Sequence, residues 1–336
     1  MTAVLVTAPY MLPYMQRFKP ILEHFGLTVL QPEVHERFSE EEILRYAGQF
    51  AGTICGDDRY SARVIAACAP ALRVISKWGT GIDSIDQQAA AEFGVRVLNT
   101  PNAFTVPVSE SVLASMLNFS RQQPWMDQAM KAGNWKKIQG KTLSESTLGV
   151  VGVGNVGKAV LRRARAFGMR LLGNDIVEIA PDFLLEEGVE MTSLQDLLSQ
   201  SDFISLNCTL NPTSHHLINR ETLSYCKRDA VIINTSRGPV IDEPALIAAL
   251  QAGQLRGAAL DVFEVEPLPL ESPLLQMENV LLSPHNTNSS PFFWERVHWN
   301  TLHNLLLGLD LPVGDLASLK ALEGQSHSAG GSAERE

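Results

Sequence analysis

The chain has 336 residues, of which 45% are hydrophobic and 19% are charged, and this length favours two domains with sizeable cores. Its formal net charge of −10 argues against broad binding to nucleic acid or to an anionic membrane surface. No apolar run approaches the roughly 20 residues that a transmembrane helix needs, and the N-terminus does not resemble a secretion signal. The four cysteines lack metal-site or C-x-x-C spacing, so we expect free thiols, no metal and a cytoplasmic protein.

Short apolar segments alternate with helical patterns from the N-terminus onward, which is typical of a parallel α/β sheet. In the first hundred residues we expect strands at 3–7, 27–30, 53–55, 72–76 and 95–99, with helices between them. A long helix then spans about 106–121, and Pro124 separates it from a second helix that ends near residue 133. The change of pattern predicts that one domain ends here.

The alternation starts again near residue 148 and supplies enough strands for a second doubly wound sheet. We expect strands at 148–153, 170–174, 203–207, 230–234, 257–261 and 280–282, with helices at 156–167, 193–199 and 243–251. A last helix spans about 291–307, and its periodicity does not indicate which domain it covers. The polar residues 321–336 are expected to be a disordered tail.

A glycine-rich turn lies between the first strand and the first helix of the second sheet. Gly152 allows a tight turn, Gly154 lets the backbone approach a pyrophosphate, and Gly157 lets helix and strand pack closely. Asn155 and Val156 lie at the start of the expected helix, where free amides and the positive end of the helix dipole suit phosphate groups. A G-x-G-x-x-G turn can also serve packing alone, but these flanks predict a dinucleotide site.

Asp175 closes the next expected strand, 18 residues after the last glycine of the turn. A carboxylate at this place can bind the ribose hydroxyls of adenosine and repel a 2′-phosphate. We therefore expect NAD(H) as the cofactor and NADP as the less favoured one.

Three residues with complementary chemistry follow three of the expected strands. Arg237 follows strand 230–234, Glu266 follows strand 257–261, and His285 follows strand 280–282. Ligands of open α/β sheets bind beyond the carboxyl ends of the strands. Reduction of a 2-keto acid needs a cation for the carboxylate, which Arg supplies, and a proton donor, which His supplies. A carboxylate beside that His favours the imidazolium. Each residue alone could be a turn or surface residue, but together they predict hydride transfer to a small acid.

Several long stretches resemble the D-isomer-specific 2-hydroxyacid dehydrogenases, the family of phosphoglycerate, glycerate and D-lactate dehydrogenases. The similarity runs from about residue 72 to residue 285, and more loosely over the first strands. The stretches that carry it are KWGTGIDSID (77–86), GNWKK (133–137), LNPTSHHLIN (210–219) and NTSRGPVIDEPALIAAL (234–250).

The resemblance implies two doubly wound parallel-sheet domains with the cleft between them. A flavodoxin-like substrate-binding domain would comprise residues 1–101 and 287–320, and a Rossmann NAD-binding domain residues 102–286. His285 would be the acid/base, oriented by Glu266, while Arg237 would hold the substrate carboxylate. A homodimer through the NAD-binding domain is implied, with the helix at 106–121 as the contact, although that helix could simply belong to the core.

The resemblance also assigns further binding residues. Lys77 and the turn formed by Gly79, Thr80 and Gly81 would contact the substrate, with the turn amides facing its carboxylate. Asp261 would bind the nicotinamide carboxamide. The nicotinamide side of the cleft would be lined by Cys208, Thr209, Thr235 and Ser236.

Two departures from the family pattern bear on the substrate. The segment NTNSSP follows His285 where the family often has an Ile- and Gly-rich stretch. The loop Gly56–Tyr60 carries Asp57 and Asp58 where phosphoglycerate-type enzymes place cations, and carboxylates there would oppose a phosphate. The sequence therefore favours an NAD-dependent enzyme for a D-2-hydroxy acid other than phosphoglycerate. It leaves open the identity of that acid, the physiological direction, a non-catalytic NAD-sensing corepressor-like protein, and oxidation of another small acid such as phosphite.

Overall fold

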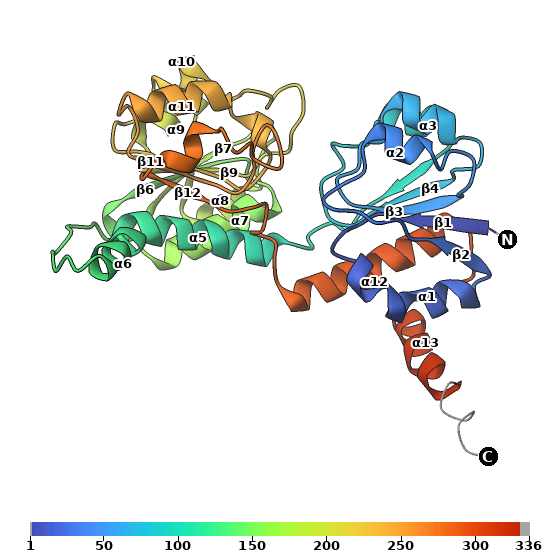
Figure 1. The fold of residues 1–336 in the computed structure, drawn as a ribbon. Helices are drawn as coiled ribbons and strands as arrows, with labels where there is room; N and C mark the ends of the chain where they lie inside the picture. The colour runs from blue at the N-terminus through green and yellow to red at the C-terminus, as the bar shows by residue number, and fades with distance from the viewer. Residues whose placement is uncertain (1, 330–336) are drawn as a thin grey trace. The chain divides into compact units, whose positions relative to one another are not determined.

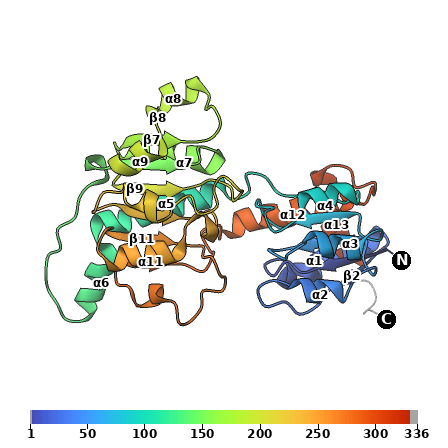
Figure 2. The same cartoon turned by 90° about the horizontal axis from the view of Figure 1, so that it is seen from above.

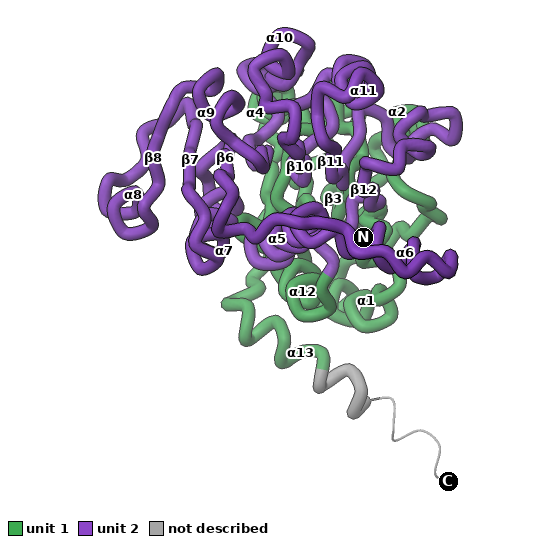
Figure 3. Tube along the Cα trace, turned by 90° about the vertical axis from the view of Figure 1, so that its left-hand side faces the viewer, with its two compact units in different colours: residues 1–103, 290–336 green, residues 104–289 purple. Residues whose placement is uncertain are grey.

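The computed structural model describes residues 2–329, with side chains described through residue 323. Contacts divide the chain into two compact units (Figure 3). Unit 1 comprises Met1–Ala103 and Ser290–Glu336, and unit 2 comprises Phe104–Ser289. For comparison, the sequence placed these boundaries after residues 101 and 286.

Unit 1 is built on a five-stranded parallel sheet in the order β2-β1-β3-β4-β5. This is the flavodoxin-like order, and all five strands end at the same edge. The strands are β1 (Thr2–Val6), β2 (Leu27–Leu30), β3 (Gly52–Cys55), β4 (Val74–Lys77) and β5 (Arg96–Leu98). Because helices cover both faces, β3 and β4 are buried along their whole length, and β1 along its last three residues, rather than at alternate positions.

Helices cover the two faces of this sheet, as Figures 1 and 2 show. One face carries α2 (Glu40–Leu44), α3 (Ala62–Cys68) and α4 (Gln87–Glu92), and the other carries α1 (Met15–His24) and α12 (Pro291–Gly308), with the short helix η1 (Leu12–Tyr14) before α1. α12 lies directly on β3 and β4, where a Cβ atom on Gly308 would overlap the side chain of Val74. Helix α12 therefore belongs to unit 1, although the periodicity of its sequence alone did not indicate which unit it covers.

The sequence predicted a disordered tail at residues 321–336, and this prediction is wrong for residues 321–329. They belong to α13 (Leu316–Ala329), which packs against α1 and α12. Leu319 is fully buried, and the Arg17 guanidinium pairs with Glu323 at 2.7 Å. These two contacts hold the start of α13 and its later turn in place. Residues 330–336 of the expected tail lie outside the described part of the chain.

Unit 2 is built on a seven-stranded parallel sheet in the order β12-β11-β10-β9-β6-β7-β8. The order reverses between β6 and β9, as in a Rossmann fold, and a nucleotide binds at such a switch point. The strands are β6 (Thr147–Val151), β7 (Arg170–Asn174), β8 (Val189–Met191), β9 (Phe203–Leu206), β10 (Val231–Asn234), β11 (Gly257–Leu260) and β12 (Val280–Leu282). The expected α/β class with two doubly wound parallel sheets is thus confirmed.

In unit 2, α9, α10 and α11 cover one face of the sheet, while α5 and α7 cover the other (Figure 1). The helices are α5 (Thr105–Arg121), α6 (Gln123–Lys131), α7 (Asn155–Ala166), α8 (Pro181–Glu187), α9 (Leu194–Gln200), α10 (Arg220–Leu223) and α11 (Glu243–Gln251), with short turns η2 (Leu143–Glu145), η3 (Gly238–Val240) and η4 (Pro273–Gln276). The apolar side of α5 is buried against α7 and β10 within the unit. The sequence did not predict α8 or β8, and β8 has no apolar run because its three residues are Val, Glu and Met. Among the described residues, no helix is both long and apolar enough to cross a bilayer.

Candidate active site

The three expected catalytic residues follow three adjacent strands of unit 2. In the register of the sheet Asn234 of β10 pairs with Leu260 of β11, and Leu260 pairs with Leu282 of β12. The three loops therefore start at the same level of one sheet edge. Arg237, Glu266 and His285 lie in these loops in that order.

Glu266 and His285 are joined directly. Oε2 of Glu266 lies 3.0 Å from Nδ1 of His285, and its Oε1 accepts the backbone N–H of Phe263 at 3.0 Å. His285 has a positive φ of 49°, and its own N–H donates to the Asp261 carbonyl at 2.8 Å. With Nδ1 engaged by the carboxylate, a proton transfer between this ring and a substrate would go through Nε2.

The segment that carries Arg237 is held against the segment that carries Glu266. A Cβ atom on Gly238 would overlap the backbone of Phe263, so only glycine fits this approach. The side-chain amide of Asn234 donates to the Arg237 carbonyl at 2.9 Å. Contacts therefore run without a break from Arg237 through Phe263 and Glu266 to His285.

Asp261 supports the loop of His285. It is 2% exposed, and each carboxylate oxygen accepts two hydrogen bonds. The donors are Oγ of Ser283 (2.5 Å), N of Asn286 (2.8 Å), and N and Oγ1 of Thr287 (3.1 and 2.6 Å). These four bonds use the whole acceptor capacity of a carboxylate. Asp261 is thus a positioning residue for His285, and the expected contact to a nicotinamide carboxamide would have to share or replace one of them.

The glycine turn has the geometry of a nucleotide cradle. Gly152 has a φ of 90°, and a Cβ atom on it would lie 2.5 Å from the backbone nitrogen of Cys208. A Cβ on Gly157 would overlap the carbonyl oxygen of Gly152, which shows how closely α7 approaches β6. A Cβ atom on Gly154, by contrast, would meet no atom of the described residues within 4 Å apart from its own neighbours in the chain. The turn is therefore tight inside and open outside, which suits a pyrophosphate.

Asp175 lies beside this turn, one residue after β7. Its Oδ2 accepts the N–H of Val153 at 2.6 Å, and its Oδ1 accepts the N–H of Val177 at 3.1 Å. The carboxylate is partly exposed, so both oxygens keep acceptor capacity for hydroxyl groups.

The expected nicotinamide-side residues follow β9 and β10. Oγ1 of Thr235 is buried and has no hydrogen-bond partner among the described residues, a state that a bound ligand would relieve. Burial raises the pKa of the Cys208 thiol to about 11, so it is a neutral side chain. Ser236 Oγ donates to Asn234 at 2.8 Å, and the Thr209 carbonyl accepts from Ser214 at 2.6 Å. The unsatisfied hydroxyl and the open cradle fit a dinucleotide.

The sequence profile of the D-isomer-specific 2-hydroxyacid dehydrogenase NAD-binding domain matches residues 113–287. A glyoxylate reductase from Korarchaeum cryptofilum is 41% identical over 69% of this chain and 71% of its own length. The chain belongs to the D-isomer-specific 2-hydroxyacid dehydrogenase family. It is therefore an NAD-dependent oxidoreductase of 2-hydroxy acids, as the sequence predicted.

Two further relatives show the spread of this dehydrogenase family. A D-3-phosphoglycerate dehydrogenase from Methanocaldococcus jannaschii is 38% identical over 80% of this chain, which spans 51% of that protein's length. The structure of D-lactate dehydrogenase from Aquifex aeolicus, complexed with NAD and lactic acid, aligns with a TM-score of 0.82 at 26% identity. That alignment covers 95% of this chain and 98% of the neighbour. The family is thus shared by proteins named for different acids.

Unit 1 carries the remaining expected site residues. Lys77 ends β4, and the Gly79–Gly81 turn follows it, with the Gly79 carbonyl accepting the N–H of Thr100 at 2.8 Å. Oγ1 of Thr80 donates to the Thr100 carbonyl at 3.0 Å. These bonds tie the turn to the segment after β5.

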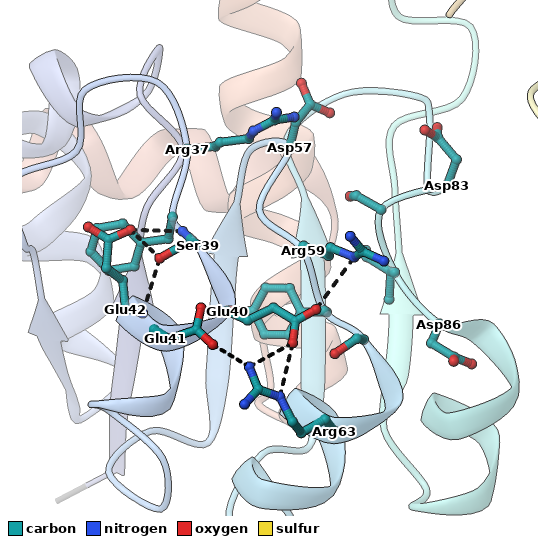
Figure 4. Close-up of a pocket in the computed structure, with 15 residues that line it drawn as sticks. Arg37, Ser39, Glu40, Glu41, Glu42, Asp57, Arg59, Arg63, Asp83 and Asp86 are labelled. Atoms are coloured by element: carbon teal, nitrogen blue, oxygen red, sulfur yellow. Dashed lines mark hydrogen bonds and ion pairs between the residues drawn. The ribbon is translucent and has the colours of Figure 1, made fainter. Parts of the chain in front are cut away.

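Unit 1 also has a pocket of about 810 Å³ beside the Gly56–Tyr60 loop (Figure 4). Lys77 and the glycine turn do not line it, whereas Asp57, Arg59 and the first turn of α2 do. Its arginines are paired: Arg59 and Arg63 lie 3.4 and 3.0 Å from Glu40. The pocket is therefore a polar hollow whose arginines Arg59 and Arg63 are engaged by carboxylates.

Sequence reasoning missed three supporting residues of the catalytic loops, namely Asn234, Ser283 and Thr287. Each is polar and stands within five residues of the end of a parallel strand. That position was the available signal, since buried polar groups at such ends need hydrogen-bond partners.

Proposed function

We propose that this protein interconverts a D-2-hydroxy acid and the corresponding 2-keto acid, with NAD(H) as the cofactor. The observation that carries the proposal is the Glu266–His285 pair at 3.0 Å, reached through continuous contacts from Arg237. The cradle around Gly154 and the unsatisfied Thr235 hydroxyl would hold the dinucleotide, which supplies the hydride when bound.

The protein's own residues would act on the acid as follows. Arg237 binds the substrate carboxylate through its two-pronged guanidinium and orients the carbonyl. In the reducing direction Nε2 of His285 donates a proton to the carbonyl oxygen, and in the oxidising direction it removes that proton from the hydroxyl. Glu266 holds the ring by Nδ1 and stabilises the imidazolium. Lys77 and the Gly79–Gly81 turn are proposed as further substrate contacts.

The test is spectrophotometric. Purified protein is mixed with NADH and, separately, glyoxylate, hydroxypyruvate, pyruvate, phenylpyruvate and phosphohydroxypyruvate, and the loss of NADH absorbance is followed. Turnover of at least one keto acid is expected. Silence on every acid, with NADH binding shown by its fluorescence, would contradict the proposal and favour a nucleotide-sensing protein.

We further propose that the protein prefers NAD(H) to NADP(H), acts in the cytoplasm and forms a homodimer through unit 2. Asp175 supports the cofactor preference, because a carboxylate beside the glycine turn repels a 2′-phosphate. Four free cysteines support the reducing compartment.

The dimer is supported by Trp135, which follows α6 and is 87% exposed, as a residue of an association surface can be. Light scattering of the wild type and of Trp135→Ala tests the dimer, and a monomeric wild type would contradict it.

A further inference from the structure

The ammonium group of Lys77 is occupied by a carboxylate of its own chain. Lys77 is the last residue of β4, and its side chain is 4% exposed. Its Nζ donates to Oδ1 of Asp57 at 2.8 Å. A buried lysine needs a compensating anion, and Asp57 supplies it.

The loop that carries Asp57 is anchored firmly. It follows β3, whose last residue Cys55 pairs in register with Lys77, so both residues stand at the same sheet edge. The next residue, Asp58, is fully buried and accepts hydrogen bonds from Oγ1 of Thr7 and from N of Phe38, both at 2.5 Å. These bonds tie the loop to the segments after β1 and β2. Asp57 is thus presented to Lys77 by a braced loop.

The charges at this edge balance. Figure 4 shows the Arg37 side chain beside Asp57. With Asp58 and Lys77 these residues make two formal positive and two formal negative charges. An anionic group that approached Lys77 would meet the Asp57 carboxylate and would have to displace it. An uncharged group would meet no such repulsion.

We propose that Asp57 is a specificity-determining residue, which neutralises Lys77 and so favours 2-keto acids whose far end is uncharged over those that end in phosphate or a second carboxylate. The inference rests on the proposed function, because it requires Lys77 to face the far end of the substrate. The place of Lys77 supports this, since ligands of open parallel sheets bind beyond the carboxyl ends of the strands. The other role for a buried pair is purely structural, and the experiment separates the two.

The experiment compares two substrates that differ in the charge of the far end, hydroxypyruvate and phosphohydroxypyruvate. The ratio of their kcat/KM values with NADH is measured for the wild type and for Asp57→Asn. The substitution keeps the shape of the side chain and removes its charge. We expect the wild type to prefer hydroxypyruvate, and the variant to shift the ratio about tenfold or more toward phosphohydroxypyruvate, mainly through KM.

Two further variants serve as controls. Glu41→Gln makes the same change of charge in the same unit, on a side chain that is 68% exposed and pairs with Arg63. It should leave the ratio unchanged. In the double variant Asp57→Asn/Lys77→Gln the shift of the kcat/KM ratio toward phosphohydroxypyruvate should disappear, because the uncompensated ammonium is what attracts the phosphate. Thermal midpoints of all variants report whether they are folded, and Asp57→Ser replaces Asp57→Asn if the latter is not.

Each outcome decides between the proposals. If the wild type reduces hydroxypyruvate but the ratio moves less than about twofold in Asp57→Asn, the inference is wrong and the proposed function stands. The inference is also wrong, and the proposed function again stands, if Glu41→Gln shifts the ratio as much as Asp57→Asn does. If no keto acid is reduced, the proposed function is wrong. The ratio is then measured as calorimetric dissociation constants in the presence of NAD+, which cannot reduce a keto acid, and an unchanged ratio again overturns the inference.

Discussion

Nδ1 of His285 lies 3.0 Å from Oε2 of Glu266, and the other oxygen of that carboxylate is held by the N–H of Phe263. The ring is therefore fixed by a side chain that is itself fixed by the backbone. Such support is what a group needs if it is to meet a substrate oxygen in one orientation.

Removal of the imidazole should abolish most turnover without affecting the cofactor. For His285→Ala we expect kcat to fall by about 10²–10⁴-fold, the usual contribution of a general acid. NADH affinity, measured by fluorescence titration, should stay within about twofold of wild type. His35→Ala, which alters an exposed histidine of unit 1, is the matched control. Activity of His285→Ala within a few-fold of wild type would exclude the assigned role.

Asp261 should be needed for the position of His285. In Asp261→Asn an amide NH₂ replaces one acceptor oxygen, so it faces the donors of Asn286 or Thr287 instead of accepting from them. Loss of hydrogen bonds to a charged group should cost about 1.5–3 kcal/mol of unfolding free energy. We expect a lower thermal midpoint and at least a tenfold lower kcat, since the loop of His285 loosens. Wild-type stability in this variant would show that the four bonds contribute little.

Substitutions of two glycines in the nucleotide turn should have different effects, one on NADH binding and the other on stability. Gly154→Ala adds a methyl group where no described atom lies within 4 Å, so it should leave the thermal midpoint unchanged and weaken NADH binding about tenfold or more. Gly157→Ala places a methyl group on the carbonyl of Gly152 and should cost about 1–3 kcal/mol of unfolding free energy. Unchanged NADH affinity in Gly154→Ala would place the pyrophosphate elsewhere.

Asp175 should set the choice between the two cofactors. In Asp175→Ser a hydroxyl replaces the carboxylate beside Val153, which removes the charge that would repel a 2′-phosphate. The ratio of kcat/KM for NADPH to that for NADH should rise about tenfold. Asp229→Asn, a paired surface carboxylate of the same unit, is the control for net charge. An unchanged ratio would show that another group excludes NADP.

His298 should make unit 1 sensitive to acid. Burial lowers the pKa of His298 from 6.5 to about 4, and its Nδ1 accepts the indole N–H of Trp78 at 2.9 Å. Between these two values the unfolded chain binds a proton that the folded chain does not, so stability falls as the pH falls from 6.5 toward 4. His298→Asn can still accept from Trp78 and does not titrate. Its thermal midpoint should therefore depend less on pH in this window, and equal slopes for both proteins would contradict the assignment.

Much of the fold could be predicted because its signals are local. Strands β7 and β12 and helix α11 lie where the apolar runs and turn residues place them. Two regions were missed or misjudged. The strand β8 has a glutamate at its centre and so no apolar run, and α13 is held by the burial of Leu319 and by the Arg17–Glu323 pair, whose partners are distant in sequence.

By itself, the sequence determined the α/β class, the glycine turn and the order in which Arg237, Glu266 and His285 follow their strands, because these depend on residue type and short spacing. Only the tertiary structure decided the partners of the buried charges. Asp261 receives four hydrogen bonds from the loop of His285, and Asp57 occupies the ammonium of Lys77. Such pairs form where neighbouring parallel strands end together, and the helices between those strands separate the partners by some 20 residues along the chain.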